Sequence, residues 1–96
     1  MEVLFADVRL ERTCTDEKTM KKRFPTPVVK GLKLRLSELR AVPAITDLLQ
    51  RPGRWEQLRE DRAGQWSGRL TANLRLLVEP RDDGTVVMVV AIEDYH

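Results

Sequence analysis

The stretch that decides the fold lies near the C-terminal end of the chain, where residues 74–93 have the sequence LRLLVEPRDDGTVVMVVAIE. Two runs of strand-forming residues flank PRDDG, and Asp-Gly is a dipeptide typical of tight hairpins. The second run, TVVMVVAI at 85–92, is continuously apolar, so we expect a central strand that is covered on both faces. The stretch therefore predicts an antiparallel pair of strands inside a sheet.

Further strands are indicated on the N-terminal side of this pair. GQWSGRL at 64–70 and NLRLLVE at 73–79 form a second predicted hairpin around residues 71–73. WEQLRE at 55–60 is a candidate short strand, and residues 2–9 partly alternate and are rich in strand formers.

Two helices are expected between the first strand and the others. TCTDEKTMKKRF indicates a short helix that Thr15 caps and Pro25 ends. The segment 26–42 indicates a second helix, with Thr26 as its cap and a buried stripe at helical spacing made of Val29, Leu32, Leu36 and Leu39. After Pro43, AITDLLQ adds one more turn.

The element order is β-α-α-β-β-β. This order predicts a single α+β domain over residues 1–96, with an antiparallel-rich twisted sheet and two N-terminal helices packed on one face. The other face of the sheet is left without a helix.

The composition and charge distribution narrow the classes of function that we expect for this chain. Residues 18–40 carry eight Lys or Arg against one acid, and residues 51–75 carry six Arg and no Lys, a segregation that suits a polyanion such as RNA. The alternative for the first cluster is a solvated helix face. A lone Cys14 fits a reducing cytosol, and one Cys with one His argues against a zinc site, so we expect no cofactor and no metal. No apolar run is long enough for a membrane helix.

The open face of the sheet carries the candidate chemistry. Regular alternation puts Ile92 on the same face as Val86, Met88 and Val90. Asp94 and His96 continue on that face, and Glu93 and Tyr95 fall on the other. Arg75 stands among four aliphatic residues, which predicts either a structural salt bridge to Glu93 or Asp94 or a phosphate clamp. With mobile arginines at 59 and 62, the set suits metal-free RNA cleavage by acid–base catalysis and charge stabilisation.

Three short motifs add a resemblance. LREDRAGQWS at 58–67, NLR at 73–75 and DYH at 94–96 resemble the C-terminal half of HigB toxins, the plasmid maintenance killer branch of the RelE/ParE superfamily. The likeness covers residues 44–96 well and the helical half only by pattern.

The resemblance implies the toxin of a type II toxin–antitoxin system, a bacterial cytoplasmic endoribonuclease that cleaves mRNA on the ribosome. Its implied partners are a helix-turn-helix antitoxin (HigA-like), mRNA and the ribosome, with DNA reached only through the antitoxin complex and no membrane contact. It implies a catalytic group made of Arg59, Arg75, Asp94, Tyr95 and His96. RNA binding is assigned to three further arginines, Arg54, Arg62 and Arg69.

One departure from the family motivates an alternative. Glu56 stands where catalytically studied relatives carry a histidine; it is a possible base, but its carboxylate repels phosphate. A second hypothesis is therefore a binding protein that has kept the fold and lost cleavage, acting as the regulatory member of a toxin–antitoxin pair. A third is the gyrase-poisoning branch of the superfamily.

Overall fold

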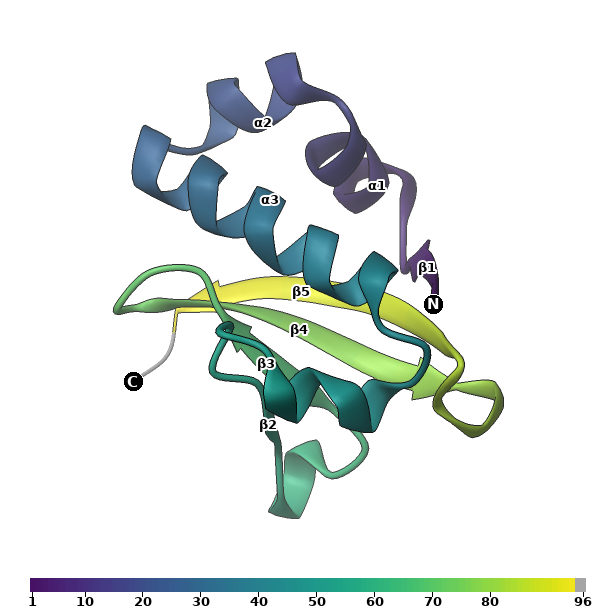
Figure 1. Ribbon diagram of the computed structural model, residues 1–96. Helices are drawn as coiled ribbons and strands as arrows, with labels where there is room; N and C mark the ends of the chain where they lie inside the picture. Colours follow the sequence, from purple (N-terminus) through teal and green to yellow (C-terminus); the bar gives the residue numbers. More distant parts are fainter. Residues whose placement is uncertain (95–96) are drawn as a thin grey trace.

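The computed structural model describes residues 1–94 and contains one five-stranded sheet in the order β1-β5-β4-β3-β2 (Figure 1). Only the β1–β5 pair is parallel; the other three pairs are antiparallel. The strands are β1 (Glu2–Phe5), β2 (Glu56–Gln57), β3 (Trp66–Arg69), β4 (Leu74–Arg81) and β5 (Val86–Asp94). The helices are α1 (Val8–Thr15), α2 (Glu17–Arg23) and α3 (Thr26–Ala41), with short 3₁₀ turns η1 (Ile45–Gln50), η2 (Glu60–Arg62) and η3 (Asp82–Gly84).

The predicted α+β class and the helical layer on one face are confirmed, but there are three helices rather than two. The strand predicted over 2–9 ends at Phe5, and α1 follows from Val8. The Asp7 carboxylate accepts a hydrogen bond from the Leu10 N–H at 2.7 Å and caps α1. This cap starts a helix at Val8, inside the segment that partial alternation assigned to the strand. Thr15, the predicted cap, instead donates its hydroxyl to the Glu11 carbonyl at 2.7 Å, within α1.

Helix α3 carries the core against the sheet. The predicted stripe is confirmed, because Val29, Leu32, Leu36 and Leu39 are all buried. They belong to one cluster with buried residues of the sheet. At Gly31 the helix passes so close to the β3–β4 turn that an added Cβ would lie 2.3 Å from the Leu70 carbonyl oxygen. No helix within residues 1–94 has the length and apolar character needed to cross a membrane.

Strand β5 differs from the expectation of a strand covered on both faces. Val87 and Val89 are fully buried towards the helices, whereas Val86, Met88 and Val90 are half-buried. The register also slips: Val78 pairs with Val89, but Leu77 pairs with Ala91, so Val90 is an extra residue in a β-bulge.

The bulge reverses the predicted alternation at the end of β5. Ile92 pairs with the core residue Leu76 and packs on the core, as Val87 and Val89 do. The prediction that Ile92 shares a face with Val86 and Met88 is therefore wrong. Glu93 pairs with Arg75 and lies on the face of the sheet that the helices leave open.

Candidate functional site: a cavity on the open face of the sheet

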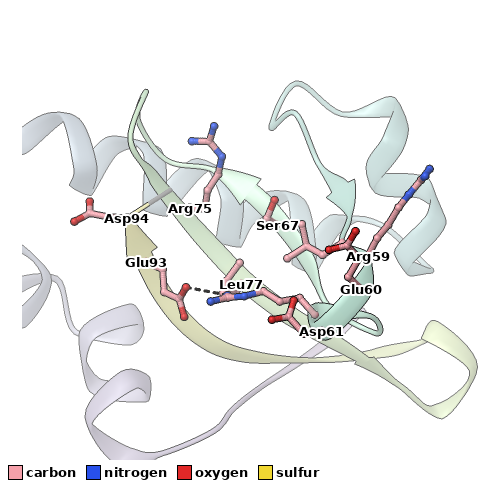
Figure 2. Close-up of a pocket in the computed structure, with 10 residues that line it drawn as sticks. Arg59, Glu60, Asp61, Ser67, Arg75, Leu77, Glu93 and Asp94 are labelled. Atoms are coloured by element: carbon pink, nitrogen blue, oxygen red, sulfur yellow. Dashed lines mark ion pairs between the residues drawn. The ribbon is translucent and has the colours of Figure 1, made fainter. Parts of the chain in front are cut away.

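A cavity of about 520 Å³ lies on this open face, and we call it the sheet cavity. Its floor comes from β3 and β4, one wall from the segment after β2, and the other wall from the end of β5 (Figure 2). The segment after β2 includes η2, so a short irregular loop partly covers a face that carries no α-helix. The lining residues are Leu58, Arg59, Glu60, Asp61, Arg62, Ser67, Arg75, Leu77, Glu93 and Asp94.

Arg75 projects from β4 at one end of the sheet cavity. Its Nη1 donates to the carbonyl oxygens of Thr71, Ala72 and Leu74 at 3.0, 3.4 and 3.2 Å. The guanidinium is thus oriented by the β3–β4 turn, which compensates part of the cost of placing a charge beside aliphatic residues.

Arg62 joins the loop to β5. Its Nη1 lies 2.8 Å from the Glu93 Oε1, and both side chains remain more than 40% exposed. Figure 2 marks this ion pair with a dashed line beside Leu77. Glu93, one of the two acids named as a possible salt-bridge partner of Arg75, therefore forms an ion pair with Arg62.

The sheet cavity contains more acid than the sequence interpretation expected. Among residues 1–94, three arginines and four carboxylates line it. The carboxylates of Glu60 and Asp61 enter through the η2 turn, and Glu60 has a left-handed backbone with φ 60°. A negatively charged substrate therefore meets repulsion here unless some carboxylates are paired with the arginines.

Several predicted site residues lie elsewhere. Glu56 lines a separate hollow on the outer side of β2 and not the sheet cavity, although Arg59 borders both. Arg69 is the cross-strand partner of Arg75 but does not line the sheet cavity, and neither does Arg54. The structure thus brings Arg59, Arg62, Arg75 and Asp94 together. Tyr95 and His96, which complete the predicted catalytic group, lie outside the described residues.

A buried network behind the sheet holds this region in place. Arg35 Nε lies 2.9 Å from Glu38 Oε1, which also accepts a hydrogen bond from Trp55 Nε1 at 2.9 Å. Arg35 Nη1 donates to the Arg69 carbonyl at 3.2 Å, and the Arg69 N–H donates to the Gly53 carbonyl at 2.8 Å. Helix α3 therefore fixes both the segment before β2 and the end of β3.

Sequence reasoning missed two lining residues, Ser67 and Leu77, that the alternation of the strands could have identified. Ser67 follows the core residue Trp66 and pairs with Leu77, so both Ser67 and Leu77 face the sheet cavity. Ser67 is 1% exposed, and its hydroxyl is therefore at the floor. The alternation of Trp66 and Ser67 was the available signal. For Glu93 no signal existed, because its face depends on the bulge.

No group of three or more His, Cys, Asp or Glu side chains within residues 1–94 is arranged to hold a metal ion. The chemistry of the sheet cavity is instead that of guanidinium groups, carboxylates and one hydroxyl over an aliphatic floor. Such a set can bind and stabilise phosphoryl oxygens and can exchange protons through carboxylates.

The arrangement of a mostly antiparallel five-stranded sheet under N-terminal helices is the RelE/YoeB-like fold. The YoeB–YefM complex from Staphylococcus aureus aligns with a TM-score of 0.64 at 21% identity, covering 100% of this chain and 97% of that chain. A YoeB/ParE toxin from Agrobacterium tumefaciens aligns with a TM-score of 0.61 at 21% identity, with 100% of both chains covered. YafQ from Escherichia coli aligns with a TM-score of 0.63 at 15% identity, covering 97% of this chain and 91% of that chain.

No protein-family model matches the chain, and no curated protein matches it. The similarity to these structures therefore establishes the fold, and the sheet cavity has to support any statement about activity.

Proposed function

We propose that this protein is the toxin of a type II toxin–antitoxin pair and that it cleaves translated mRNA without a metal ion. The observation that carries the proposal is the sheet cavity, where Arg59, Arg62, Arg75 and Asp94 come together from three separate segments of the chain. The motifs that resemble HigB toxins contribute these same residues, which favours the HigB branch.

The proposed reaction uses the 2′-hydroxyl of RNA as the nucleophile. A base removes its proton, the oxygen attacks the adjacent phosphorus, and an acid protonates the leaving 5′-oxygen. Arg75, which the turn carbonyls orient, is assigned to the phosphoryl oxygens, with Arg59 on the opposite wall. The terminal group of Asp94, Tyr95 and His96 is assigned to proton transfer on the basis of the motif.

Growth after induced expression tests the site. We expect arrest with the unchanged protein and relief of arrest with Arg75→Ala or with a chain that ends at Asp94. Arg81→Ala is the matched control, because Arg81 lies on the same strand and face as Arg75 but six residues away, about 20 Å along the strand. Full toxicity of both site variants would remove the support for this assignment.

Primer extension on translated mRNA tests the reaction. A ribosome-dependent endoribonuclease produces new 5′ ends only when the message is being translated, and Arg75→Ala should abolish them. New ends on free RNA as well would show cleavage without ribosome dependence.

A specific observation also supports a second function, a RelE-fold binding protein without cleavage. Four carboxylates line the sheet cavity, and Glu56 does not line it. Glu56 stands at the position of the family's histidine, but its carboxylate repels phosphate. Such a protein would produce no new 5′ ends, yet would still bind its partner. Double-strand breaks with intact message would instead indicate the gyrase-directed branch.

The proposed partner is a helix-turn-helix antitoxin of the HigA type, through which the pair would bind operator DNA. The YoeB structure from Staphylococcus aureus is a complex with YefM, which supports a partner of this general kind. Co-expression with the product of the adjacent gene should suppress growth arrest, and the two proteins should copurify.

A further inference from the structure

The Arg62–Glu93 ion pair lies within the lining of the sheet cavity. Arg62 reaches from the loop after β2 to the end of β5, across the floor made by β3 and β4. Glu93 is also the register partner of Arg75, so its backbone lies beside the strand that carries Arg75. The position of this carboxylate therefore marks a place to which an anion is attracted.

A carboxylate and a phosphate are interchangeable partners for a guanidinium. Both offer two oxygens in a plane, which match the two parallel N–H groups of arginine. Arg62 and Glu93 are about half exposed, at 46% and 41%, so water and salt reach both groups. Exposed ion pairs of this kind contribute little to stability, so exchanging the carboxylate for another anion costs little free energy.

We infer that Arg62 forms a phosphate subsite of the sheet cavity and that Glu93 acts as its internal competitor, which an RNA phosphate displaces. This inference rests on the proposed function and adds to it a second phosphate position beside the one assigned to Arg75. In the free protein Glu93 neutralises Arg62; in the RNA complex the released carboxylate turns away and Arg62 binds the phosphate.

Glu93 is not part of the motif that resembles the toxin family, which begins at Asp94. It faces the sheet cavity only because the bulge at Val90 rotates the end of β5. The competitor is therefore a property of this chain, set by one residue identity and one irregularity of register.

Binding of a single-stranded RNA oligonucleotide, 2′-O-methylated to prevent cleavage, tests the inference. Fluorescence anisotropy at several KCl concentrations gives both the affinity and its salt dependence. For Glu93→Gln we expect affinity to rise by about 3–10-fold. The slope of log K against log salt should stay as in the wild type, because Arg62 contacts the phosphate in both complexes. Arg62→Ala should make the slope shallower by about 0.7, the value for one phosphate contact to a single strand.

Glu79→Gln is the matched control. Glu79 pairs with Arg81 at 3.3 Å on the same face of the sheet, but it does not line the sheet cavity. It should leave affinity and slope unchanged. In an Arg62→Ala background, Glu93→Gln should raise affinity by a smaller factor, because the carboxylate no longer competes for Arg62.

The outcomes separate the inference from the proposed function. If wild-type protein binds the oligonucleotide and Glu93→Gln has the affinity and slope of Glu79→Gln, the competitor role is overturned while RNA binding stands. If Arg62→Ala leaves the slope unchanged, Arg62 makes no phosphate contact and the subsite is wrong. If no variant binds the oligonucleotide, the inference is overturned, and the primer-extension experiment decides the proposed function separately.

Discussion

The chain contains two Glu–Arg pairs of nearly equal length in opposite environments, which permits a matched test of what burial does to an ion pair. Arg35 and Glu38 lie 2.9 Å apart with side chains 11% and 10% exposed, whereas Arg62 and Glu93 lie 2.8 Å apart and are about half exposed. The same substitution, Glu to Gln, can be made in each pair.

We expect Glu38→Gln to destabilise the fold by about 3 kcal/mol. Removing one partner of a buried pair leaves the other charge uncompensated, at a cost of about 3–5 kcal/mol. The lower end applies because the pairing is already incomplete: within residues 1–94, Glu38 Oε2 has no hydrogen-bond partner, and the Arg35 Nε–H is not directed at the oxygen it approaches. Gln also keeps an acceptor for Trp55.

Thermal unfolding followed by circular dichroism measures the difference. A change of 1 kcal/mol shifts Tm by about 4–8 °C in a domain of this size, so Glu38→Gln should lower Tm by about 12–24 °C. Glu93→Gln should lower it by less than about 8 °C, because exposed pairs contribute about 0–1 kcal/mol. Equal shifts in the two variants would refute the argument that burial governs these pairs. A double variant with both Arg35 and Glu38 replaced by apolar residues should recover part of the loss.

Three further predictions concern the helical layer. Gly31→Ala should destabilise the fold by about 1–3 kcal/mol in urea unfolding, because its Cβ would meet the Leu70 carbonyl and α3 would have to move away from the sheet. Asp7→Ala should cost about 1 kcal/mol by the same measurement through loss of the α1 cap, and Asp7→Asn should restore most of it. Burial raises the pKa of the Cys14 thiol to about 11, against the lowering influence of Arg40. The native state thus keeps a proton that the unfolded state releases near pH 9, so stability should fall between about pH 9 and pH 11, and Cys14→Ala should lack this fall. A thiol reagent that labels native protein rapidly at pH 8 would contradict the last prediction.

The parts of the fold that the sequence predicted are those set by local pattern. The stripe from Val29 to Leu39 has helical spacing, and the hairpin around residues 71–73 joins two runs of strand formers, so neither required knowledge of the rest of the chain. The start of helix α1 was missed because residues 2–9 partly alternate and include several strand formers, whereas the Asp7 cap begins a helix at Val8. The short β1 that remains pairs only with the first part of β5.

The sequence predicted which residues belong to the candidate site better than it predicted how they are arranged. Arg59, Arg62 and Arg75 were identified by residue type and motif, and the structure places them around one cavity. That Arg62 contacts Glu93, 31 residues away, depends on the path of an irregular loop, which no periodic pattern encodes. The acidic lining was missed for the same reason, since Glu60 and Asp61 reach the cavity through a turn with a left-handed residue.

The bulge at Val90 means that β5 holds one residue more than its ladder with β4 requires. If the same residues paired in continuous register without a bulge, Ile92 would lie opposite Arg75, and Glu93 would pair with Leu74 on the face towards the helices. Deletion of this single valine would instead give a regular ladder in which Glu93 stays opposite Arg75. In this sequence, the group that contacts Arg62 therefore depends on where the β4–β5 ladder accommodates its extra residue, which is within the apolar run that precedes the charged end of β5.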